Sequence, residues 1–215
     1  MALYAAILPL ITALFGLGSG MLIWIKKKGV LRKQILLWLT LIFTAHYALS
    51  VFLGMSTDSV IFWQAAIPFL SLALLTGMFF TIQITRDFRE TDSVFLLLCL
   101  ISTAGGVLSV ENTTEFLGVT LPVFSPILFG VFLVFVLIAW GEVLYNLIIV
   151  TIASKKTELK KYRKNVTLLT TSLSLIYGLN FLDAFFVYAG VLMIPTAAVF
   201  ATLPFLLLLL FMYSS

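Results

Sequence analysis

Long apolar runs recur along almost the whole chain, and only short polar segments separate them. Such a run spans a bilayer as a helix when it reaches about 20 residues, because a helix satisfies its own backbone hydrogen bonds in lipid. We therefore expect an all-α polytopic membrane protein, with residues 1–215 forming a single seven-transmembrane helix bundle. The expected spans are residues 2–25, 35–54, 60–82, 93–110, 127–153, 166–187 and 191–213.

Composition supports a membrane protein and excludes a second, soluble domain. Hydrophobic residues make up 62% of the 215 residues and charged residues 10%, whereas soluble domains are about 25% charged. The net charge of +4 could indicate nucleic-acid binding. The basic residues, however, lie in short loops between apolar runs, where they set topology and contact anionic lipid. Nucleic acid is therefore not an expected partner, and the lipid bilayer is.

The placement of the basic residues predicts the orientation. All thirteen Lys and Arg residues follow the first, third or fifth apolar run, mainly in Lys26–Lys28, Arg86–Arg89 and Lys155–Lys164. Loops rich in Lys and Arg remain cytoplasmic. The N-terminus is therefore expected outside and the C-terminus in the cytoplasm, in the plasma (cytoplasmic) membrane of a prokaryote.

The end of the chain gives a further expectation about partners. Tyr213–Ser215 carry no basic anchor on the side where the orientation requires one. We therefore expect the natural chain to continue past Ser215 into a cytoplasmic signalling domain, or a partner subunit to cap this end. A homodimer is a further association open to such a bundle.

The sixth run carries a stripe of polar side chains. Asp183 lies about 26 Å along a helix from the inner end of this run and hence near the outer surface. It is either a hydrated carboxylate at the interface or a ligand contact. We predict that an outward-facing cavity between helices two, three, six and seven holds a small polar or amphipathic ligand or ordered water. The residues predicted to line it are Tyr177, Asn180 and Asp183, with Tyr47 and Gln64 from neighbouring spans.

Glu142 is the second ionisable candidate. Tyr145 and Asn146 follow it at helical spacing, so the three side chains share one helix face. Counted back from Lys155, Glu142 lies near the membrane midplane, where a carboxylate must be protonated, paired or hydrated. A functional role and a hydrogen-bonded structural role are both open. His46 is either a satisfied core histidine or a proton-sensitive partner of Glu142.

No combination of residues indicates an enzyme. The chain has one His and one Cys, too few for a zinc site that needs three or four protein ligands. A membrane haem with two axial histidines is likewise excluded, and Gly18–Gly20 has no histidine in its own span to activate Ser19. We expect no catalytic residues, no metal and no cofactor.

The layout resembles a family of sensors. Microbial rhodopsins also have seven spans, but their retinal lysine has no counterpart in residues 191–213. In topology, loop length and mid-span tryptophans such as Trp38 and Trp63, the chain resembles the N-terminal seven-transmembrane sensor region of bacterial and archaeal histidine kinases and related signalling proteins. The resemblance implies a domain that binds a small ligand, or senses the membrane, and signals to a cytoplasmic module.

Two other functions remain open. Short strings recur between the two halves of the chain: Tyr47–Leu49 with Tyr177–Leu179, and Pro68–Leu70 with Pro204–Leu206. A parallel repeat of three, one and three helices is similar to the SWEET sugar transporters, whose site lies between the two triplets. The third hypothesis is a structural subunit of a membrane complex, in which the polar residues only hold helices together.

Overall fold

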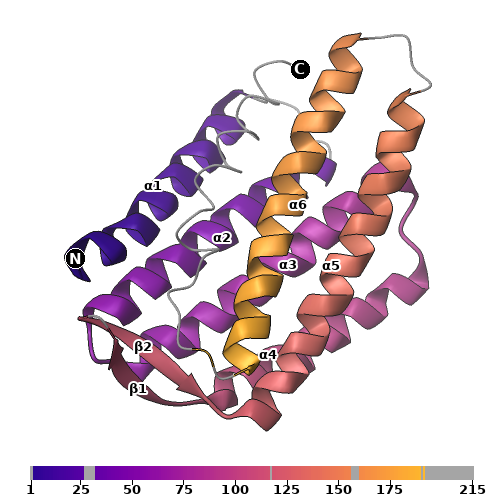
Figure 1. The fold of residues 1–215 in the computed structure, drawn as a ribbon. Helices are drawn as coiled ribbons and strands as arrows, with labels where there is room; N and C mark the ends of the chain where they lie inside the picture. Colours follow the sequence, from indigo (N-terminus) through magenta and orange to yellow (C-terminus); the bar gives the residue numbers. More distant parts are fainter. Residues whose placement is uncertain (1, 27–31, 117, 156–159, 190, 192–215) are drawn as a thin grey trace.

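The computed structural model describes residues 2–26, 32–116, 118–155, 160–189 and 191 (Figure 1). The expected seventh span, residues 191–213, lies outside the described residues except for Val191. Six α-helices correspond to the first six expected spans. They are α1 (Ala2–Lys26), α2 (Arg32–Ser56), α3 (Val60–Thr85), α4 (Val94–Ser109), α5 (Pro126–Lys155) and α6 (Lys160–Tyr188), and the short 3-10 helix η1 (Glu90–Ser93) precedes α4.

Within the described residues, five helical segments are long and apolar enough to cross a membrane: α2, α3, η1 together with α4, α5 and α6. The shorter apolar stretch Ile7–Met21 lies within α1. The outward surface agrees with this composition. Leu97, Leu100 and Leu108 on α4 and Ile127 on α5 are among the large apolar side chains exposed at the periphery. A soluble domain rarely exposes so much contiguous apolar surface, whereas lipid solvates it. The chain is thus a helical bundle with the composition of a multi-pass membrane protein.

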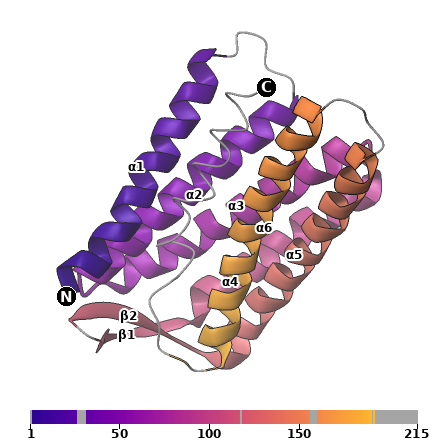
Figure 2. The same ribbon diagram turned by 45° about the horizontal axis from the view of Figure 1, so that its top comes forward.

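The helices run alternately up and down, with α3 at the centre of the bundle (Figures 1 and 2). α3 packs against α2, α4 and α5, while α1 packs on α2 and α6 on α5. Of the five candidate spans in the described residues, α3 has the largest share of buried residues. Polar contacts add to this packing, since Thr40 on α2 donates a hydrogen bond to Thr76 on α3 at 3.0 Å.

A β-hairpin joins α4 to α5, in the segment between the fourth and fifth expected spans. β1 (Val110–Phe116) pairs antiparallel with β2 (Val119–Phe124), and Gly118 in the turn has a φ of 80°. Glycine occupies this left-handed region without the steric cost that a Cβ imposes. The expectation of purely α-helical structure therefore needs this one correction.

The hairpin defines one end of the bundle. It packs against α1, α2 and α3, and Thr113 on β1 donates a hydrogen bond to Asp58, in the turn between α2 and α3, at 2.6 Å. We call this the hairpin end. The C-terminal ends of α3 and α5 lie at the opposite end of the bundle (Figure 1). We call it the basic end, because Arg86 and Arg89 follow α3 and Lys155 closes α5.

Candidate functional site

A cavity of about 390 Å³ lies at the hairpin end, between α2, α3, α5, α6 and the hairpin. Pockets that bind small molecules are typically about 300–1,000 Å³ and mostly apolar, with a few polar groups. This cavity has that character. Its described lining residues are Tyr47, Trp63, Ala66, Ile67, Leu70, Thr114, Leu121, Pro122, Val123, Phe124, Phe129, Phe132, Asn180, Asp183, Ala184, Val187 and Val191.

α3 contributes one continuous face to the cavity. Trp63, Ala66, Ile67 and Leu70 follow the spacing of residues that lie above one another on a helix. The Trp63 indole packs over Gly54 of α2, where an added Cβ would lie 2.7 Å from the indole nitrogen. Gly54 therefore allows the close approach that brings Trp63 to this wall.

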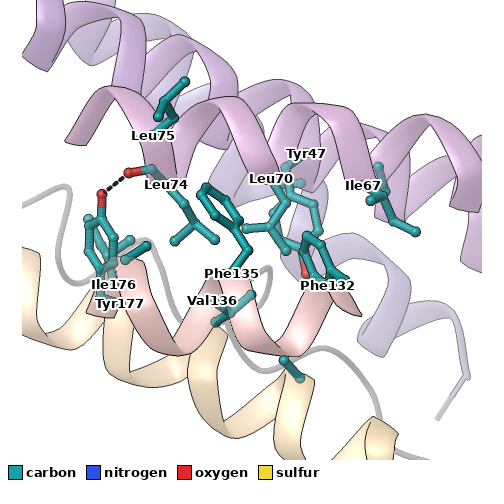
Figure 3. Close-up of a cluster of buried hydrophobic side chains, with 14 of the residues drawn as sticks. Tyr47, Ile67, Leu70, Leu74, Leu75, Phe132, Phe135, Val136, Ile176 and Tyr177 are labelled. Carbon is teal, nitrogen blue, oxygen red and sulfur yellow. Dashed lines mark hydrogen bonds between the residues drawn. The ribbon is translucent and has the colours of Figure 1, made fainter. Parts of the chain in front are cut away.

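Tyr177 fixes α6 against α3 below the cavity. Its hydroxyl donates a hydrogen bond to the backbone carbonyl oxygen of Leu74 at 2.5 Å (Figure 3). The hydroxyl rests over Gly77, where any Cβ would collide with it. Asn180 and Asp183 follow at intervals of three residues, so this contact places both side chains at the height of the cavity.

Two buried polar atoms of the lining residues have no hydrogen-bond partner among the described residues. They are the indole nitrogen of Trp63 and the side-chain oxygen Oδ1 of Asn180. Both residues are 3% exposed. The amide nitrogen of Asn180 donates to the Ile176 carbonyl at 2.8 Å, which leaves the amide oxygen as an acceptor. An unsatisfied buried polar group costs about 1–3 kcal/mol. Each of the two atoms exposes less than 1 Å², so neither faces the open space of the cavity.

Asp183 supplies the charge of the cavity. It is 7% exposed, so it is not a carboxylate hydrated in bulk water. It interacts electrostatically with the buried phenol of Tyr47, which comes from α2 and also lines the cavity. Among the described lining residues, Asp183 is the one charged side chain. The site therefore combines an apolar, aromatic wall with a single carboxylate.

The structure brings together only part of the predicted set. Tyr47, Asn180 and Asp183 line the cavity, whereas Tyr177 is fully buried in the core beneath it. Gln64 is half-buried and is not among the described lining residues. Its neighbour Trp63 lines the cavity instead, because successive residues point about 100° apart around a helix.

Sequence reasoning missed the contributions of α5 and the hairpin. Phe129 and Phe132 form the α5 wall, and β2 covers the cavity with residues such as Leu121. Figure 3 shows Phe132 of α5 lying near Tyr47 and Leu70 at one end of the core. Apolar residues are abundant in every span, so no local pattern distinguishes these from lipid-facing ones.

Glu142 belongs to a separate group of polar residues near the basic end. The Asn146 amide nitrogen donates to a Glu142 carboxylate oxygen at 3.0 Å, and Thr85 donates to the Asn146 amide oxygen at 2.6 Å. Arg86 lies 3.9 Å from the same Glu142 oxygen. The structure places Glu142 beside Arg86, the residue that follows α3. Tyr145 is 62% exposed and makes neither of these hydrogen bonds.

The same group extends into the connection between α3 and α4. Arg86 donates two hydrogen bonds to Asp92, each 2.7 Å long. The backbone nitrogen of Arg89 donates to Asp92 at 2.8 Å. The hydrogen bonds from Arg86 to the Asp92 carboxylate raise the pKa of the guanidinium. We call Thr85, Arg86, Asp92, Glu142 and Asn146 the polar network.

His46 lies apart from Glu142. Its ring nitrogen Nδ1 is 2.8 Å from the Ile42 carbonyl, and its ring lies 5.2 Å from that of Phe69 on α3. Among the described residues, no hydrogen bond or ion pair joins His46 to Glu142. The contacts of His46 are those of a core histidine between α2 and α3.

The described residues contain no cluster of three or more His, Cys, Asp or Glu side chains that could hold a metal ion. Comparison of the chain with protein-family models, with curated proteins and with solved structures gives no match in any of the three.

Proposed function

We propose that this protein is a membrane receptor that binds a small ligand in the cavity at the hairpin end and signals through the bundle to the cytoplasmic side. The observation that carries the proposal is a preformed cavity of about 390 Å³ whose apolar and aromatic lining includes the polar side chains of Asn180 and Asp183. A core that served packing alone would gain by burying apolar side chains at these positions.

The helices that build the cavity also reach the basic end. α3 contributes Trp63 to the cavity and Thr85 to the polar network, while α5 contributes Phe132 and Asn146. A ligand between α3 and α5 at one end would favour one relative position of the two helices and so alter the contacts at the other. It could do so only through a difference in its affinity for the two positions.

The proposal includes seven spans with the hairpin end outside and the basic end in the cytoplasm. Arg86, Arg89 and Lys155 would then lie on the inner surface, near anionic lipid. This orientation suits the N-terminal sensor region of prokaryotic histidine kinases, which the chain resembles in layout. A cytoplasmic signalling module would receive the output.

A cavity-filling variant tests the proposal. Ala184 lines the cavity and is buried, so Ala184→Phe should occupy part of the ligand space. We expect compounds from a small-molecule panel to raise the Tm of the wild-type protein but not that of Ala184→Phe. Ala104→Phe is the matched control, because Ala104 is exposed on α4 and should leave the compound response intact.

Two results would contradict the receptor proposal. If no compound distinguishes the wild type from Ala184→Phe, the cavity is not a ligand site. If a bound compound crosses the bilayer in proteoliposomes at a rate that Ala184→Phe abolishes, the SWEET-like transporter is correct instead.

A further inference from the structure

A groove of about 560 Å³ lies between α5 and α6, which pack side by side (Figures 1 and 2). We call it the α5–α6 groove. It reaches Lys155, the last residue of α5 at the basic end. None of its described lining residues also lines the cavity at the hairpin end. The groove is therefore a second candidate site, separate from the receptor cavity.

One face of α5 forms the apolar side of the α5–α6 groove. Leu144, Ile148 and Ile152 follow one another at intervals of four residues, so they lie in one row along the helix. Lys155 comes three residues later and ends this row. Ile148 and Ile152 are 58% and 54% exposed, as suits side chains that contact acyl chains. The row is thus an apolar surface that ends in an ammonium group.

The length of this row matches one leaflet of a bilayer. Leu144 and Lys155 are eleven residues apart in the sequence, which is about 16 Å along a helix. The hydrocarbon core of a bilayer is about 30 Å thick, so one leaflet contributes about 15 Å. A lipid whose head group lies at Lys155 would therefore extend its acyl chain along the row as far as Leu144.

Hydroxyl groups complete the lining. Thr170, Thr171 and Ser174 of α6 line the side opposite the apolar row. Thr151 of α5 also lines the groove and lies one turn, about 6 Å, inside Lys155. A hydroxyl both donates and accepts hydrogen bonds. These groups therefore suit the glycerol and ester oxygens of a phospholipid, which lie between its phosphate and its acyl chains.

The basic end supplies positive charge at the mouth of the groove. Lys155 and Lys164 are both exposed. Lys155 has an interaction within the chain, but residues 155–164 include six basic residues and one acidic residue, Glu158. One acidic residue cannot neutralise six basic ones, so the segment keeps a positive net charge. Basic pockets between membrane helices attract anionic lipid head groups.

We propose that the α5–α6 groove holds one anionic phospholipid. Its phosphate lies near Lys155, its glycerol and ester oxygens lie near the threonine and serine hydroxyls, and one acyl chain follows the apolar row of α5. A zwitterionic lipid would bring an ammonium group of its own to the basic segment, and a soluble anion would leave the apolar row without a partner. This site does not depend on a ligand in the receptor cavity.

Native mass spectrometry of the full chain, delipidated in mild detergent, measures the preference for an anionic lipid. The two probes are phosphatidylglycerol and phosphatidylcholine with identical palmitoyl and oleoyl chains, so that only the head groups differ. We expect one phosphatidylglycerol to bind about tenfold more tightly than phosphatidylcholine, because each basic residue near a head group contributes about a factor of five.

Two pairs of variants assign the lipid to the groove. Lys155→Gln should lower the tenfold ratio about fivefold. Lys164→Gln removes the same charge outside the described lining and should keep the ratio. Ser174→Phe should weaken the binding of both lipids about tenfold, because the ring takes the space of the acyl chain. Ala153→Phe adds the same ring at an exposed position of α5 outside the described lining and should leave both affinities unchanged.

Several results would overturn the proposal. Equal binding of the two lipids, or equal effects of Lys155→Gln and Lys164→Gln, would leave only a general attraction of lipid to the basic segment. Unchanged affinities in Ser174→Phe would place the lipid elsewhere. A dimer that persists without lipid and excludes phosphatidylglycerol would show that a second copy of the chain covers the groove. If Ser174→Phe does not fold, the comparison of Lys155→Gln with Lys164→Gln still decides the matter.

Discussion

The Tyr177 hydroxyl of α6 donates a hydrogen bond to the Leu74 carbonyl of α3 at 2.5 Å, across the space that Gly77 leaves open (Figure 3). Tyr177 and Leu74 are both almost fully buried. This contact sets the height of α6 against α3, and with it the position of Asn180 and Asp183 at the cavity.

A double-mutant cycle tests this contact. Gly77→Ala should lower the free energy of unfolding by roughly 1–3 kcal/mol, because the new methyl group collides with the Tyr177 hydroxyl. Tyr177→Phe alone should cost about 1 kcal/mol, the usual contribution of one hydrogen bond. In combination, the two changes should cost less than their sum, since the second removes the atom with which the first collides.

Gly178→Ala is the control for this cycle. A Cβ at Gly178 of α6 would meet nothing within 4 Å, so the change should be neutral or stabilise the helix by about 0.5–1 kcal/mol. Denaturant unfolding in lipid–detergent micelles measures all four variants. Strict additivity of Gly77→Ala and Tyr177→Phe would contradict the packing described.

The amide of Asn146 should matter more for stability than the side chain of Tyr145, which follows Glu142 on the same helix. Asn146→Leu removes the partner of both Thr85 and Glu142, so we expect a loss of about 2 kcal/mol in the free energy of unfolding. Tyr145→Leu changes an exposed side chain on the same helix and should stay within about 0.5 kcal/mol of the wild type. Equal effects of the two changes would argue against the polar network.

The contact between Arg86 and Asp92 predicts that lysine cannot replace arginine there. Arg86 bonds both carboxylate oxygens of Asp92, and a lysine ammonium does not reproduce this two-pronged geometry. We expect Arg86→Lys to lower the free energy of unfolding by about 1 kcal/mol. Arg89→Lys should leave the free energy of unfolding unchanged, because Arg89 donates to Asp92 through its backbone nitrogen. If Arg86→Lys leaves the free energy of unfolding unchanged, the paired hydrogen bonds between Arg86 and Asp92 do not stabilise the protein.

Labelling of introduced cysteines tests the orientation. Thr57, after α2, and Arg89, after α3, are exposed at opposite ends of α3. In intact cells, a membrane-impermeant maleimide should modify Thr57→Cys at once and Arg89→Cys only after permeabilisation, because basic loops stay inside. The native Cys99 is buried and should give little background. Labelling of both positions from the same side of the membrane would contradict the proposed orientation.

The helices were predictable from sequence because lipid imposes length and apolarity on each span separately. The expected range 60–82, for example, became α3 (Val60–Thr85). The β-hairpin was missed because Glu111, Asn112 and Glu115 resemble a polar loop. Its strand signal consists of a few buried positions, Val110, Val119 and Leu121, too few to compete with that polarity.

The cavity was only partly predictable, because its walls depend on which helices touch. The polar residues of α6 could be grouped from their spacing, and two of them line the cavity. Trp63 rather than Gln64 faces the cavity, which follows from the rotation of α3 and not from polarity. Glu142 meets Arg86 only because α3 and α5 pack together, a contact between helices that are not adjacent in sequence.

A cryo-electron microscopy map of the full chain in nanodiscs, inspected between Trp63, Phe132 and Asn180, would show directly whether the cavity holds a ligand. We expect non-protein density in the cavity, in contact with lining residues such as Trp63 and Phe132, and loss of that density in Ala184→Phe. A map in which the chain's own side chains fill this space, with no other density, would contradict the receptor proposal.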